Sequence, residues 1–192
     1  MSTAIGLHGT ELFYQGEHSM KIAVTGAHRV GKTTLVNQLI ESLPEYEFKE
    51  EAYYELEEKG FVFSEVPGPE DYVMQLEHSL KQISAGGKNV IFDRCPIDLL
   101  AYIQATQAFN NINIQAWYRR VYNVMSAIDL LVFVPVEAPD VIGCPESGLP
   151  ELRHQVNEIL HDWIWDFGID VVEVVGSPLS RRNQVMTYLS KI

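Results

Sequence analysis

One stretch decides the fold: Lys21-Ile-Ala-Val-Thr-Gly26-Ala-His-Arg-Val-Gly31-Lys-Thr-Thr-Leu35. Residues 21–25 are mostly apolar or β-branched, which is typical of a buried strand. From Lys32 onward the apolar residues recur at helical spacing, as far as Leu43. Glycine adopts backbone angles that other residues resist, so Gly26 and Gly31 predict a sharp loop between the strand and the helix.

The loop carries a phosphate-binding pattern. Residues 26–33 match G-x-x-x-x-G-K-[ST] at every fixed position, directly after a predicted strand and before a predicted helix. Such a loop points backbone N–H groups at phosphate oxygens, and the positive end of the helix strengthens the attraction. Lys32 would then reach the β- and γ-phosphates of ATP, and the Thr33 hydroxyl would bind Mg²⁺. The candidate nucleotide-binding residues here are Gly26, Ala27, His28, Arg29, Val30, Gly31, Lys32, Thr33 and Thr34.

The chain from Met20 onward alternates strand-like and helical stretches. Strands that are apolar throughout and separated by helices are typical of a parallel sheet covered on both faces. Further strands are predicted at 46–49, 89–93, 130–135 and 170–175. Helices are predicted at 32–43, 51–58, 69–85, 98–109, 115–127, 152–167 and 180–191. The prediction is an α/β three-layer sandwich that forms a single domain over residues 20–192.

Composition limits the partners. The 192 residues include 26 Asp and Glu against 14 Lys and Arg, for a formal charge of −12. Binding of duplex nucleic acid depends on Lys and Arg that neutralise phosphates, so nucleic acid is not an expected partner. Two cysteines argue against a disulfide scaffold and for a reducing compartment. The longest apolar run is about six residues, against the ~20 that cross a bilayer. We expect a cytoplasmic protein that binds no membrane.

Residues 1–19 are treated separately. They show no clear periodicity, and Glu11-Leu-Phe-Tyr-Gln-Gly16 looks like a scrambled protease-cleavage tag. The prediction is an expression leader, and a native, loosely attached arm is the alternative. The start of the chain has no basic region followed by an apolar stretch, so no secretory signal is expected.

Charged residues follow the second and third predicted strands. Asp93 ends the third strand, where ligands of open α/β sheets gather, and it would bind Mg²⁺ or accept a proton. Arg94 would clamp phosphate or substrate oxygens. A helix cap for Asp93 and a plain ion pair for Arg94 are the alternatives. After the second strand, either Glu50 or Glu51 would face the substrate as a base, unless both belong to a solvated helix start.

These stretches, with others, resemble the P-loop nucleoside and nucleotide kinases. The resemblance rests on KIAVTGAHRVGKTTL, FKEEAYYELEEKG, NVIFDRCPIDLLAY, PELRHQVNEIL and GSPLSRR, and it covers nearly all of residues 20–192. More narrowly, the chain is similar to AAA-domain proteins allied to the kinase part of bifunctional nicotinamide-ribonucleotide enzymes. The resemblance implies a five-stranded parallel sheet of order 2-3-1-4-5.

The resemblance also implies roles for individual residues. Asp93-Arg94 matches the Asp-Arg motif that lies at the metal and the acceptor phosphate in this family. Glu51 matches the acid that serves deoxynucleoside kinases as base. The family usually has Glu-Pro at that point, whereas this chain has Glu51-Ala52.

Two arginine-bearing regions complete the expected site. Kinases of this type close a lid with arginines over the phosphates, which excludes water. The loop 136–150 followed by Arg153 is the predicted lid, and other cations that would assist it are His154 and either Arg119 or Arg120. For each, a surface ion pair is the alternative.

The second region follows the last strand. Gly176-Ser-Pro178, with Arg181 and Arg182, resembles the loop that holds adenine in these kinases, and a guanidinium can stack on a base. An ordinary helix start with Ser180 as the N-cap is the alternative.

The expected function is transfer of the ATP γ-phosphoryl group to a small nucleoside- or nucleotide-like acceptor. A regulatory ATPase that switches a protein partner is the alternative, and nucleotide binding without turnover is a third. The expected ligands are ATP, Mg²⁺ and the acceptor, and a homodimer is left open. The predicted catalytic residues are Lys32, Glu51, Asp93, Arg94 and Arg153, and the predicted metal ligands are Thr33 and Asp93.

Overall fold

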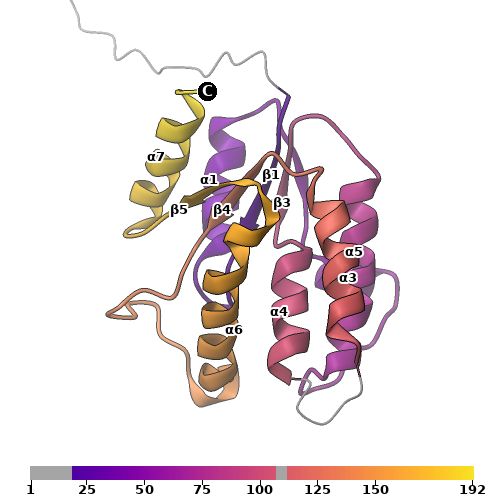
Figure 1. Ribbon diagram of the computed structural model, residues 1–192. Helices are drawn as coiled ribbons and strands as arrows, with labels where there is room; N and C mark the ends of the chain where they lie inside the picture. Colours follow the sequence, from indigo (N-terminus) through magenta and orange to yellow (C-terminus); the bar gives the residue numbers. More distant parts are fainter. Residues whose placement is uncertain (1–18, 107–111) are drawn as a thin grey trace, which may run out of the picture.

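The computed structural model describes residues 19–106 and 112–192 (Figure 1). Its strands are β1 (Lys21–Thr25), β2 (Glu47–Lys49), β3 (Val90–Asp93), β4 (Leu130–Phe133) and β5 (Asp170–Glu173). They form a five-stranded sheet in the order β2-β3-β1-β4-β5, and every neighbouring pair is parallel. The predicted α/β class and the strand order implied by the resemblance are therefore confirmed.

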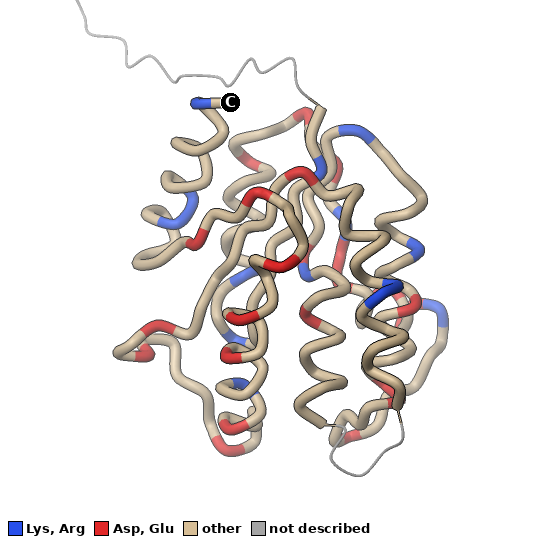
Figure 2. The backbone as a smooth tube through the Cα atoms, viewed as in Figure 1, with Lys and Arg blue, Asp and Glu red and all other residues tan. Residues whose placement is uncertain are grey.

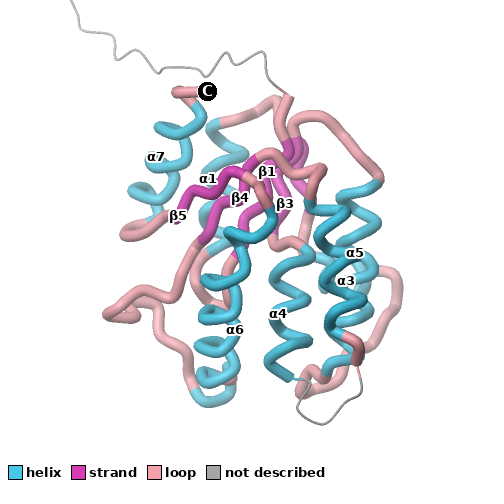
Figure 3. Tube along the Cα trace, in the orientation of Figure 1, coloured by secondary structure: helices cyan, strands magenta, loops and turns pink. Residues whose placement is uncertain are grey.

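Helices cover both faces of this sheet (Figure 3). The helices α1 and α7 pack together on one face, and α4 lies on the other face in contact with α3, α5 and α6. Within the described ranges, no helix is both long and apolar enough to cross a membrane. The helical elements are α1 (Lys32–Ser42), α2 (Ala52–Glu58), α3 (Pro69–Ser84), α4 (Pro96–Thr106), α5 (Ile114–Met125), η2 (Glu146–Gly148), α6 (Pro150–Trp163), η3 (Ile164–Phe167) and α7 (Pro178–Leu189).

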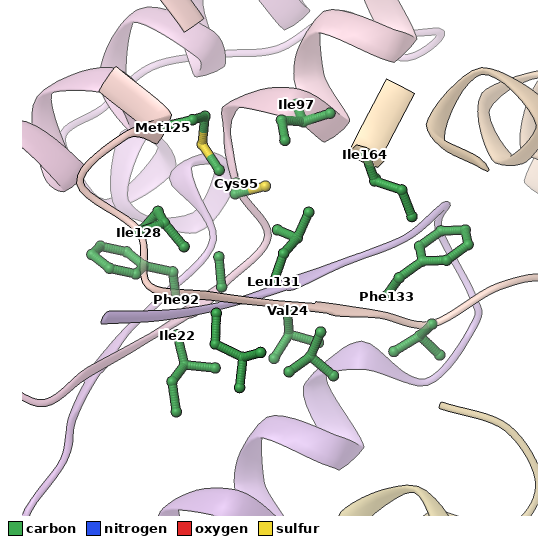
Figure 4. Packing of buried hydrophobic residues seen from close by; sticks show 14 of the residues in the cluster. Ile22, Val24, Phe92, Cys95, Ile97, Met125, Ile128, Leu131, Phe133 and Ile164 are labelled. Atoms are coloured by element: carbon green, nitrogen blue, oxygen red, sulfur yellow. The ribbon is translucent and has the colours of Figure 1, made fainter. Parts of the chain in front are cut away.

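The core lies on both sides of the central strands (Figure 4). Ile22 and Val24 of β1 point toward α1, whereas Leu131 and Phe133 of β4 point toward the opposite layer. Side chains alternate along a strand, so a strand buried on both faces must be apolar at nearly every position. The sheet in turn brings the ends of β1 and β3 to one edge. Charged residues are spread over the helices and loops (Figure 2).

Some boundaries differ from the prediction. The helix expected at 98–109 begins at Pro96, because the fixed φ of proline suits a first helical turn, and its predicted end falls outside the described residues. The helix expected at 180–191 begins at Pro178 for the same reason. Ser177 caps it by accepting from Ser180 N at 3.2 Å, so Ser180 as the N-cap was wrong. All but Ser19 of the predicted leader lies outside the described residues.

Candidate functional site

The glycine-bounded loop joins β1 to α1 with the predicted backbone. Gly26 has a φ of 149° and Gly31 a φ of 91°, both unfavourable for residues with a Cβ. A Cβ on Gly26 would also lie 2.4 Å from Val134 O, which no packing tolerates. Gly31 forms the N-cap of α1, so the loop runs directly into the positive end of the helix.

Lys32 is the first residue of α1, and its side chain reaches back to the loop. It is 6% exposed, and its Nζ donates to Ala27 O at 2.7 Å. Burial, followed by the charge of Arg94, lowers the pKa of Lys32 to about 8, while Asp98, Glu51 and Asp93 oppose the shift. An ammonium group held by one carbonyl and no ion pair in the described structure is well placed to exchange that contact for a phosphate oxygen.

Asp93 and Thr33 meet at the carboxyl end of β3. The Thr33 hydroxyl donates to the Asp93 carboxylate, and burial of this carboxylate raises its pKa. Asp93 Oδ1 is buried and has no hydrogen-bond partner among the described residues. Carboxylate and hydroxyl oxygens are the hard ligands that Mg²⁺ prefers, and phosphates and water usually complete its shell. The two predicted metal ligands therefore lie together and fit Mg²⁺.

Arg94 is brought against Glu51. Arg94 Nε lies 2.7 Å from Glu51 Oε1, and both side chains are largely buried. The contact is an ion pair rather than a hydrogen bond, because within the described structure Arg94 Nε has no partner at hydrogen-bond geometry. The guanidinium also lies 5.2 Å from the centre of the Tyr102 ring. Glu50 is exposed, so Glu51 is the acid that faces the site.

A cavity of about 220 Å³ opens beside this charge pair. Tyr53, Tyr72 and Tyr102 lie in its wall, so aromatic rings and one largely buried ion pair meet around a space of small-molecule size. Its lining residues are His28, Glu51, Tyr53, Pro67, Tyr72, Gln75, Arg94, Tyr102, Ser147, Gly148, Leu149 and Leu152.

A second cavity, of about 420 Å³, lies beside Gly31 at the start of α1. Gly176-Ser-Pro178 and Arg181 line it, as the predicted base-binding loop would. Arg181 is 4% exposed, and its guanidinium donates to Val30 O and to Glu137 Oε1. Arg182 points elsewhere and donates to Ser42 Oγ at 2.8 Å. The sequence named both arginines for this loop, whereas in the structure only Arg181 of the two lines the cavity.

Arg153 contacts main-chain carbonyl groups of the loop. It is 1% exposed and donates to His28 O at 3.0 Å and to Arg29 O at 3.1 Å. It also forms an ion pair with Asp140, and this hydrogen bond lowers the pKa of Asp140 to about 2. A contact between Arg153 and phosphate would require these bonds to break, so its catalytic role stays a prediction.

The other cations named for the lid lie on the surface. Arg119, Arg120 and His154 are exposed, and Arg120 stacks over the Trp117 ring at 4.2 Å. Its Nη1 is 3.9 Å from Glu77, which is the surface ion pair that the sequence left as the alternative.

Sequence reasoning missed two contacts that α4 makes with the loop between β1 and α1. Asp98 is fully buried; its Oδ1 accepts from Gly26 N at 2.7 Å, and its Oδ2 accepts from Cys95 N at 2.9 Å. Tyr102 Oη accepts from His28 N at 2.7 Å. The available signal was the spacing: an Asp and a Tyr one helical turn apart share a helix face, next to the Asp-Arg motif.

Comparison with known proteins identifies the family of this chain and its fold. A family model described as an AAA domain matches residues 21–182. The deoxyadenosine kinase from M. mycoides with bound dATP is 18% identical with a TM-score of 0.64, and the match covers 89% of this chain and 99% of that chain. The thymidylate kinase from Ehrlichia chaffeensis is 17% identical with a TM-score of 0.63, and the match covers 90% and 99%.

The NadR protein in complex with NR is 21% identical with a TM-score of 0.67. That match covers 90% of this chain but 50% of NadR, so this chain corresponds to half of that protein. No curated protein matches the sequence. Since the AAA-domain model spans most of the chain and the fold is shared with these kinases, the chain belongs to the AAA-domain family and has the fold of the P-loop nucleoside and nucleotide kinases.

Proposed function

We propose that this protein is a Mg²⁺-dependent phosphotransferase that moves the γ-phosphoryl group of ATP to a small nucleoside- or nucleotide-like acceptor. One observation carries the proposal: a cavity walled by Glu51, Arg94 and tyrosines adjoins the loop that the Lys32 side chain contacts. A protein that only binds or hydrolyses ATP needs no second small-molecule cavity at that point.

The chemistry assigned to each residue follows from its position. Lys32 would exchange Ala27 O for phosphate oxygens and offset the charge that develops during transfer. Thr33 and Asp93 would hold Mg²⁺, which when bound neutralises phosphate charge. Glu51 would accept the proton of the acceptor hydroxyl, and Arg94 would hold that carboxylate in place.

The second cavity is assigned to the adenine base. Glu137, Gly176, Pro178 and Arg181 give it both apolar walls and polar edges. The similarity to a deoxyadenosine kinase and a thymidylate kinase supports acceptors that carry a nucleobase. The proposal includes a cytoplasmic location and excludes nucleic acid and membranes as partners.

The test is ADP formation from ATP and Mg²⁺ with and without members of a panel of nucleosides, nucleotides and ribosylnicotinamide. We expect at least one compound to stimulate ADP release and to appear as its phosphorylated product in mass spectrometry. ADP release that no panel member stimulates, at any pH between about 6 and 9, would contradict the kinase and favour the regulatory ATPase. The regulatory ATPase has one supporting observation, since Arg153 of the predicted lid is held by the loop carbonyls.

Glu51→Gln separates binding from chemistry in that assay. The substitution keeps the size of the side chain but removes the proton acceptor, so turnover with a hydroxyl acceptor should fall by roughly 10²- to 10⁴-fold. Affinity for Mg·ADP should be retained, because Glu51 faces the acceptor cavity rather than the Gly31 side of the loop. Glu50→Gln is the matched control, since Glu50 is exposed, and it should leave turnover unchanged.

A further inference from the structure

The loop that binds phosphate also carries a histidine with a complete set of partners. His28 N donates to Tyr102 Oη at 2.7 Å, and His28 Nδ1 lies 2.8 Å from the same oxygen. His28 Nε2 contacts Gly148 O. A carbonyl oxygen can only accept, so Nε2 must carry the proton. In the neutral ring Nδ1 is then an acceptor, and the Tyr102 hydroxyl donates to it. The contacts are therefore satisfied by one neutral tautomer, with hydrogen on Nε2.

Tyr102 connects this histidine to the acceptor cavity. Its ring forms part of the cavity wall and stacks on Tyr72 at 4.8 Å with an interplanar angle of 20°. The Arg94 guanidinium lies over the ring and hydrogen-bonds the hydroxyl. The same phenol therefore contacts the charge pair of the acceptor cavity and the main chain of the phosphate loop.

Gly148 connects the histidine to the cover of the cavity. Ser147, Gly148 and Leu149 belong to the cavity wall, and Gly148 ends η2. A continuous chain of contacts thus runs from the Tyr72 stack through Tyr102 and His28 to the η2 segment of the cavity wall.

We propose that Tyr102 and His28 are positioning residues: the Tyr102 hydroxyl fixes the tautomer and rotamer of His28, whose Nε2–H holds η2 over the acceptor cavity while its backbone N–H fixes the phosphate loop. Neither group needs to touch ATP or the acceptor. Burial lowers the pKa of His28 to about 4, with the charges of Arg94, Lys32 and Arg153 acting in the same direction, so the ring stays neutral near pH 7. The inference refines the proposed phosphotransferase but rests only on the phosphate loop being a nucleotide site.

The first measurement is the nitrogen NMR signature of the His28 ring at about pH 7, assigned by comparison with His28→Gln. We expect the neutral tautomer protonated on Nε2. In Tyr102→Phe the ring stack is kept but the hydroxyl is gone, so we expect a mixture of tautomers and an affinity for Mg·AMP-PNP weaker by roughly fivefold to tenfold. Tyr72→Phe removes a hydroxyl from the other ring of the stack and should leave the His28 signature unchanged.

The second measurement separates the two ends of the His28 side chain. The amide nitrogen of Gln can replace Nε2, whereas Asn reaches only to the position of Nδ1. Hydrogen exchange in residues 140–149 should therefore be near wild type in His28→Gln and faster in His28→Asn. Three outcomes would each overturn the proposal. The first is a wild-type His28 ring protonated on Nδ1, and the second is a Tyr102→Phe variant with unchanged tautomer and unchanged affinity. The third is equal hydrogen exchange in the His28→Gln and His28→Asn variants. The tautomer and the hydrogen exchange can be measured without phosphoryl transfer. A negative result in them can therefore be distinguished from failure of the proposed kinase activity.

Discussion

The phosphate loop is held differently on its two sides. Helix α4 supplies oxygen acceptors to the loop amides: Asp98 binds Gly26 N, and Tyr102 binds His28 N. Helices α6 and α7 supply guanidinium donors to the loop carbonyls, through Arg153 and Arg181. The amide side shares residues with the acceptor cavity, whereas each arginine also pairs with an acid of the segment after β4.

This difference indicates that the two sides connect the loop to different parts of the site. The amide-side anchors connect the loop to the site where an acceptor would bind. The carbonyl-side anchors connect it to residues 137–142, which border the proposed adenine cavity. A buried N–H group that loses its acceptor cannot bond to water instead. The acids that pair with the arginines are partly exposed, so water can replace the lost guanidinium. Damage to the amide side should therefore have the larger effect.

The largest loss of stability is expected for Asp98→Ala. The variant leaves the buried Gly26 N–H and Cys95 N–H without an acceptor, so the free energy of unfolding should fall by roughly 2–5 kcal/mol. Urea unfolding measures it. Asp98→Asn, which keeps one acceptor oxygen, should fall between the wild type and the Ala variant; a loss in the Ala variant below about 1 kcal/mol would remove Asp98 as an anchor.

A pH experiment isolates His28 on the same side. The pKa of His28 is about 4 in the folded chain, against 6.5 for an unperturbed histidine such as that of the unfolded chain. As the pH drops, the unfolded chain therefore binds the proton first. Stability should fall between about pH 6.5 and pH 4. Between about pH 7.5 and 4.5 this group alone should remove roughly 2–3 kcal/mol from the free energy of unfolding.

The matched control for that experiment is His28→Gln, which has no titrating group but keeps a donor for Gly148. The wild type should lose more stability than this variant over the same pH interval. Equal losses in urea titrations of the two proteins would mean that His28 is not held neutral by burial.

A smaller effect is expected on the carbonyl side. Arg153→Met keeps the apolar stem but removes the donors to His28 O and Arg29 O, while Asp140 can turn to water. The free energy of unfolding should fall by roughly 1–3 kcal/mol, and hydrogen exchange in residues 137–149 should accelerate. Arg120→Met, on the surface of α5, should change neither quantity. A larger loss in Arg153→Met than in Asp98→Ala would reverse the comparison.

Local patterns predicted the parts of the site that the backbone encodes. Gly26, Gly31 and Lys32 act within one strand–loop–helix unit, so their spacing alone indicated the loop. Asp93 was found because the ends of parallel strands share one edge of the sheet. The same rule brought Glu51 into range but left Glu50 as a rival, since only tertiary packing decides which of two adjacent carboxylates faces inward.

Contacts between distant helices were beyond such reasoning. Asp98 and Tyr102 are 72 and 74 residues from the amides that they bind, and Arg153 and Arg181 are separated from their carbonyl partners by more than 120 residues. Nothing in the local sequence distinguishes Arg181, which is buried against the loop, from Arg182, which bonds to Ser42. Only the packing of α7 on α1 makes that distinction.

The most direct test of the central claim is calorimetric titration of the wild type and of Lys32→Ala with Mg·AMP-PNP. The wild type should bind one nucleotide, and the variant should bind it roughly tenfold to a hundredfold more weakly, because a charge-assisted contact to phosphate is lost. The variant should keep its thermal midpoint, since Lys32 makes one hydrogen bond and no ion pair in the described structure. Equal affinity in the two proteins would contradict a nucleotide site at this loop.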